Sequence, residues 1–155
     1  MGGTKQREGE LILKLYELRR DDALRRAREW YAVEFNPRGA ADIVSLMRSG
    51  LRESAHYRMV TTYWDMAAAL VNYGSIAPEL FHASNTEYLA IFAKIEPFIG
   101  EVRAQFGAPG YLRELERVAR DAPGAAEYFE KIRLLMSRWA EAHAQKSAEV
   151  SRDEK

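Results

Sequence analysis

Apolar residues in this sequence recur at intervals of three and four positions, which is the spacing of one face of an α-helix. The clearest run lies near the C-terminus and consists of Tyr128, Ile132, Leu135, Met136, Trp139 and Ala142. No segment sustains the apolar–polar alternation that a half-buried strand needs. The pattern therefore predicts an all-α protein, an irregular multi-helix bundle of about five to seven helices with no β-sheet.

Glycine, proline and capping residues divide this pattern into separate helices. Asp21 is a candidate N-cap inside the first helical stretch, residues 10–35, which is then either one bent helix or two. Gly50 is a candidate break in the second stretch. Pro97 removes a backbone donor, so a kink or a break is expected there. The longest helices are expected at residues 54–73, 86–106 and 125–145, packed around Tyr63, Leu70, Ile132 and Trp139.

The chain has 155 residues, of which 47% are hydrophobic, and this is enough for one domain with a real core. The polar ends carry little apolar periodicity. We therefore predict a flexible N-terminus at residues 1–8, a single helical domain at 9–146, and a flexible C-terminal tail at 147–155.

Composition argues against several classes of function. The 23 basic and 23 acidic residues cancel, whereas a nucleic-acid-binding protein usually has a basic excess. The longest uncharged run, residues 66–78, is shorter than the roughly 20 apolar residues of a spanning helix, so no membrane insertion is predicted. The absence of cysteine excludes disulfides and thiolate chemistry. The polar N-terminus has no signal-peptide core, and a cytoplasmic protein of bacterial type is expected.

Two Glu-x-x-His motifs are the strongest indication of a metal site. Glu53 with His56 and Glu79 with His82 have the spacing found in carboxylate-bridged di-metal centres of helical bundles. However, the helix predicted at 54–73 would place the two motifs roughly 25 Å apart at 1.5 Å per residue. We therefore predict no metal site and no cofactor. The sequence also has no nucleophile elbow and no phosphate-binding glycine loop, so no catalytic residue is assigned and a non-enzymatic protein is predicted.

One acidic residue, Asp65, stands in the mostly apolar stretch RMVTTYWDMAAALVNYG, residues 58–74. On a helical wheel, Asp65 falls on a thin polar stripe with Arg58 and Asn72, opposite a broad apolar face. A structural aspartate is the favoured interpretation. If a ligand site exists, the candidate ligand-binding residues are His56, Arg58, Tyr63 and Asp65. The stripe could face water, another helix or a second copy of the chain.

The segments LYELRRDDALRRAREWYAVEFNP, YWDMAAALVNYGSIAPELF and EPFIGEVRAQFG are similar in order and style to uncharacterised all-helical bacterial proteins of this length. The resemblance spans about two-thirds of the chain. It implies an all-α fold and assigns no activity or residue roles.

Many aromatic residues and wide apolar helix faces remain to be explained. We therefore predict a protein–protein interaction or scaffold module that self-associates, with a homo-oligomer or another protein as partner. The alternative is a small-molecule-binding or enzymatic bundle with a pocket near Asp65.

Overall fold

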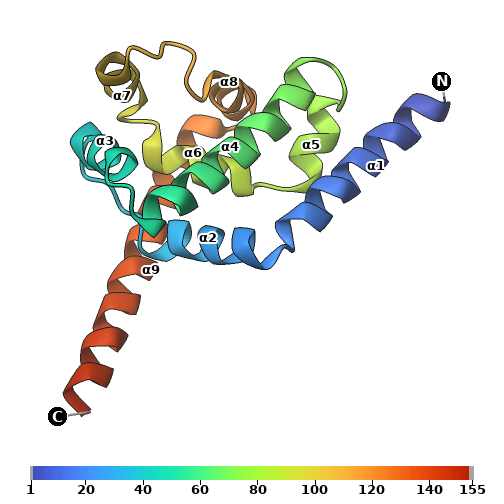
Figure 1. Cartoon of the computed structure of the whole chain (residues 1–155). Helices are drawn as coiled ribbons and strands as arrows, with labels where there is room; N and C mark the ends of the chain where they lie inside the picture. Colours follow the sequence, from blue (N-terminus) through green and yellow to red (C-terminus); the bar gives the residue numbers. More distant parts are fainter. Residues whose placement is uncertain (1, 154–155) are drawn as a thin grey trace.

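The computed structural model describes residues 2–153, which form nine α-helices and no strand (Figure 1). This confirms the all-α prediction, but the expected number of helices was too low. The helices are α1 (Gly2–Arg19), α2 (Asp22–Val33), α3 (Ala40–Arg48), α4 (Arg52–Asn72), α5 (Pro78–Ser84), α6 (Glu87–Ile95), α7 (Ile99–Phe106), α8 (Arg113–Asp121) and α9 (Ala125–Asp153).

The additional helices arise because the helical stretches are interrupted near Asp21, Gly50 and Pro97, the three positions where the sequence indicated a possible break. Asp21 Oδ1 accepts the backbone N–H groups of Ala23 (2.9 Å) and Leu24 (3.2 Å), so α2 starts anew after α1. Gly50 adopts a left-handed φ of 66° between α3 and α4. Pro97 lies between α6 and α7, so the single helix expected at 86–106 is two helices.

The long helix α4 runs through the centre of the molecule (Figure 1). It packs most extensively against α8 and α2, whereas α9 covers α6 and also contacts α2. Aromatic side chains fill the space between these helices, as edge-to-face and tilted ring pairs. The largest fully buried side chains are Trp64, Tyr31, Tyr57, Tyr88, Phe81 and Phe92.

The N-terminal end of α1 and the C-terminal half of α9 extend away from the rest of the molecule (Figure 1). Residues 2–8 belong to α1 and residues 147–153 to α9, although both were expected to be flexible ends. Their flexibility stays a prediction, and residues 1, 154 and 155 lie outside the described part. From Ser137 onwards almost every side chain of α9 is exposed. Trp139, expected in the core, is 50% exposed, because α9 continues past the helices that cover its first half.

None of the described helices combines the length and the apolar character that crossing a membrane requires.

Candidate functional site

The four candidate ligand-binding residues of α4 turn towards different neighbours. The Tyr63 hydroxyl donates to the carbonyl of Leu15 on α1, and burial raises the Tyr63 pKa to about 12. His56 packs against the ring of Trp30 on α2, with ring centroids 5.9 Å apart. Arg58 is exposed. The structure does not bring these side chains together with Asp65, and ligand binding by them stays a prediction.

Asp65 holds the start of α8. Its Oδ1 accepts the backbone N–H of Leu115 (2.9 Å), in the first turn of α8. Burial raises the pKa of the Asp65 carboxyl, and the Leu115 N–H opposes this by stabilising the carboxylate. Seven residues later in α4, Asn72 donates to the carbonyl (3.1 Å) and to Oε2 (2.6 Å) of Glu114. The part of the polar stripe formed by Asp65 and Asn72 therefore faces α8, whereas Arg58 at its other end is exposed to water.

This geometry predicts the effect of changing Asp65. Asp65→Ala should lower the free energy of unfolding by about 1–2 kcal/mol, because the N–H of Leu115 in the first turn of α8 loses its acceptor. Asp65→Asn keeps an oxygen in place and should cost less. Arg58→Ala, an exposed neighbour, should stay within about 0.5 kcal/mol of the original chain. Urea denaturation monitored by circular dichroism measures all three, and an unchanged Asp65→Ala variant would contradict the capping role.

A buried lysine was not singled out by the sequence patterns. Lys94 on α6 is 6% exposed, and its Nζ donates to the carbonyls of Tyr31 (2.7 Å), Ala32 (3.0 Å) and Phe35 (2.6 Å). A fourth contact joins Nζ to Oδ1 of Asn36 (3.2 Å). These carbonyls lie at or just after the C-terminal end of α2, where the helix leaves acceptors unpaired. An ammonium placed there also interacts favourably with the helix dipole.

Burial lowers the pKa of the Lys94 ammonium to about 8. A lysine with a lowered pKa is often a nucleophile or a base in an enzyme. Here every N–H of the ammonium already has a protein acceptor, and no hydrogen is free to position a substrate. Lys94 therefore connects α6 to the C-terminal end of α2 through hydrogen bonds.

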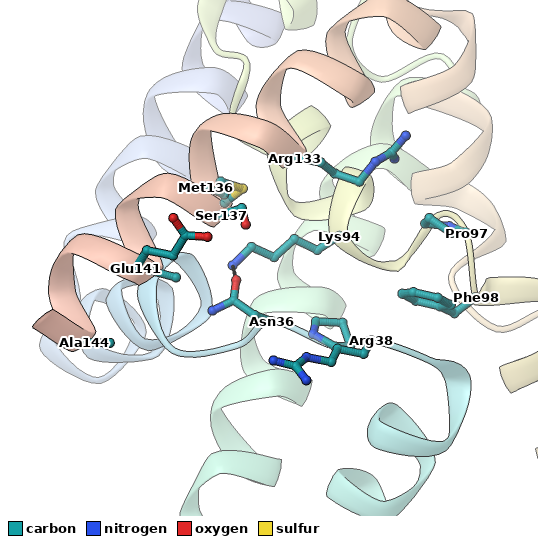
Figure 2. A pocket seen from close by; sticks show the side chains of 12 residues that line it. Asn36, Arg38, Lys94, Pro97, Phe98, Arg133, Met136, Ser137, Glu141 and Ala144 are labelled. Carbon is teal, nitrogen blue, oxygen red and sulfur yellow. Dashed lines mark hydrogen bonds between the residues drawn. The ribbon is translucent and has the colours of Figure 1, made fainter.

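Lys94 lies in a cleft of about 450 Å³ beside α9. Figure 2 shows Lys94 extending towards Asn36, with Glu141 of α9 and Arg38 of the loop after α2 on either side. Arg133 donates to the carbonyl of Ala93 (3.0 Å) and closes one wall. The sequence feature that corresponds to this cleft is Lys94 itself, a single basic residue within a mostly apolar stretch. Asp65 is likewise a single acidic residue within a mostly apolar stretch.

A second groove of about 470 Å³ lies among α2, α6 and α9. The α9 residues that line it are Tyr128, Ile132, Met136 and Trp139. Met136 lines both this groove and the Lys94 cleft, so α9 separates the two. Trp139 is therefore both half exposed and part of the wall of this groove.

Within residues 2–153, no three His, Asp or Glu side chains gather in a way that could hold a metal ion. Glu53 and His56 line a small surface hollow with His143. His82 instead interacts through Nδ1 with the hydroxyl of Tyr88, and burial lowers the His82 pKa.

A comparison with protein families places most of this fold in a known group. The profile described as Domain of unknown function (DUF4760) matches residues 7–122. The chain belongs to the DUF4760 family. The matched part of this DUF4760 protein contains Asp65 and Lys94 and ends just before α9. Comparisons with curated proteins and with solved structures give no match.

Proposed function

We propose that this DUF4760 protein is a non-enzymatic interaction module that self-associates through α9. The observation that carries the proposal is the exposed apolar face where α9 leaves the body of the fold. Leu134 is 56% exposed and Trp139 is 50% exposed, and Leu135 between them is also exposed. The part of α9 beyond Ser137 has almost no buried side chain. Most helical stability in proteins comes from the packing of an apolar face, and this half of α9 lacks such packing.

A second copy of the chain fits this surface because groove and exposed side chains lie side by side on α9. One two-fold operation can place Trp139 of each copy in the groove of the other, which is the self-complementarity of an isologous dimer. The charges of the free half also suit such pairing. Arg138, Glu141, Lys146 and Glu149 alternate in sign, so two copies of this helix do not repel each other strongly.

The test combines Leu135→Ser with Trp139→Ser and compares oligomeric state by sedimentation equilibrium. The original chain should form dimers. The double variant should be monomeric or should dimerise at least about 30-fold more weakly, because a buried tryptophan at an interface contributes about 2 kcal/mol or more.

The matched control is Tyr73→Ser, which removes another large exposed aromatic residue at the far end of α4. Tyr73 is 81% exposed, and this variant should dimerise like the original chain. An original chain that is monomeric at every concentration contradicts the proposal. An equal loss in both variants would also contradict it, because the effect would then not depend on α9.

A further inference from the structure

One face of the central helix α4 is open to solvent along its whole length, although most of its residues are apolar or small. Its large apolar side chains are 37% to 81% exposed, namely Leu51, Met59, Met66 and Tyr73. Between them lie Ala55, Thr62 and Ala69, which are exposed or half-buried. We call these residues the α4 seam. It extends from the residue before α4 to the residue after it, roughly 33 Å at 1.5 Å per residue.

The spacing of the α4 seam is that of a helix that packs against another helix. From Ala55 to Tyr73 its residues follow one another at intervals of 4, 3, 4, 3 and 4 positions, as the contact positions of a coiled coil do. Large and small residues alternate along it. The large set is Met59, Met66 and Tyr73, and the small set is Ala55, Thr62 and Ala69. Side chains of a second helix can therefore enter the hollows above the small residues.

Both edges of the α4 seam are fixed to neighbouring helices. At one edge, the Tyr63 hydroxyl donates to the carbonyl of Leu15 on α1. At the other edge, Asp65 accepts the backbone N–H of Leu115 on α8. The position of α4 is thus already set, and a partner that binds the seam orders little of this chain.

The exposed charges of α4 are basic. Arg52 and Arg58 are exposed, and neither forms an ion pair within residues 2–153. The two acidic residues of α4, Glu53 and Asp65, are partly buried. A second copy of α4 therefore has no exposed carboxylate to pair with these arginines, whereas a helix with acidic residues at its flanking positions complements them.

We propose that the α4 seam binds an amphipathic helix of another protein, with large aliphatic residues at heptad spacing and acidic residues beside them. The aliphatic residues fill the hollows above Ala55, Thr62 and Ala69. The acidic residues face Arg52 and Arg58. The proposal goes beyond self-association and is independent of it, because α9 contributes no residue to the seam.

The experiment measures the binding of two fluorescently tagged three-heptad peptides to the full chain by fluorescence anisotropy. Both peptides carry leucine at the seam-facing positions, with glutamate at the flanking positions of one and lysine at those of the other. Like charges keep each peptide from pairing with itself. The glutamate peptide should bind at least about tenfold more tightly at low salt, and the difference should shrink at high salt.

Two double variants locate the binding on the seam. Met59→Ser with Met66→Ser should weaken binding of the glutamate peptide at least about tenfold, because two apolar contacts are lost. Arg52→Gln with Arg58→Gln should reduce the preference for the glutamate peptide to less than about threefold. All four side chains are exposed, so both variants should keep the urea midpoint of the original chain.

The matched control is Leu13→Ser with Tyr16→Ser, which removes another pair of exposed apolar side chains, on α1. This variant should bind the glutamate peptide like the original chain. Equal weakening in the α1 and α4 variants would contradict the proposal, because binding would then depend only on general surface hydrophobicity.

Four further results would overturn the proposal. The first is that neither peptide binds saturably, and the second is that the lysine peptide binds as tightly as the glutamate peptide. The third is loss of dimers in Met59→Ser with Met66→Ser by sedimentation equilibrium, which would assign the seam to self-association. The fourth is cosedimentation with phosphatidylserine vesicles that this double variant abolishes, which would assign the seam to a membrane surface.

Discussion

A chain that ends at Ala122 should fail to fold cooperatively, although it retains the whole segment that matches the DUF4760 profile. Phe129 and Met136 of α9 are buried, and Phe129 packs edge-to-face on Phe92 of α6 with centroids 5.6 Å apart. Each buried side chain of this size contributes about 1.5–3 kcal/mol, and the uncovered face of α6 adds a similar loss. The total, at least about 5 kcal/mol, is comparable with the stability of a whole domain.

The matched control is a chain that ends at Ser137. It keeps Phe129 and Met136 and removes the exposed half of α9, so at protein concentrations too low for dimers its stability should stay within about 1 kcal/mol of the full chain. Near-ultraviolet circular dichroism and urea denaturation distinguish the two truncations. A cooperative transition for the shorter chain at the original urea midpoint would show that α9 is not part of the core.

Replacing Lys94 with Met should lower the free energy of unfolding by about 2–4 kcal/mol at pH 7. The three carbonyls that accept from the ammonium would be left unpaired, and each costs about 1–3 kcal/mol. Removal of a buried charge offsets part of this loss. Lys5→Met is the control, because Lys5 is exposed and its replacement should change stability by less than about 0.5 kcal/mol.

Lys94 should also give the protein a characteristic pH dependence. Its pKa is about 8 in the folded chain against an ordinary value of 10.5. Between pH 8 and 10 the unfolded chain therefore binds more protons at this residue than the folded chain. Stability should rise with pH in that window by on the order of 2 kcal/mol.

The rise should end above pH 10, because burial raises the pKa of Tyr31 and Tyr57 and the unfolded tyrosines lose their protons first. Lys94→Met should lack the rise between pH 8 and 10 and keep the fall above it. Urea denaturation at half-unit intervals of pH measures both. A rise that persists in Lys94→Met would assign it to another group.

The helices could be predicted from the sequence because their signals are local. The spacing of apolar residues, the Asp21 cap and the Pro97 break all act within a few residues, and the structure confirms each. Burial was less predictable. The apolar periodicity of α9 includes Trp139, but periodicity gives the direction of a face and not the point where its neighbouring helices end.

The candidate sites were less predictable than the helices because their partners are distant in the sequence. Asp65 could be placed on a polar stripe, but its acceptor role depends on Leu115, which no local pattern connects to it. Lys94 depends on carbonyls near residue 31 in the same way.

The bonds from Lys94 to the end of α2 also bear on the order in which the chain acquires its structure during synthesis. The ammonium and its carbonyl acceptors are separated by roughly sixty residues. The carbonyls at the end of α2 can therefore accept hydrogen bonds from Lys94 only after α6 has emerged from the ribosome. The packing of α2 on α4 can form before that point, whereas the connection of α2 to α6 forms only once this lysine is present.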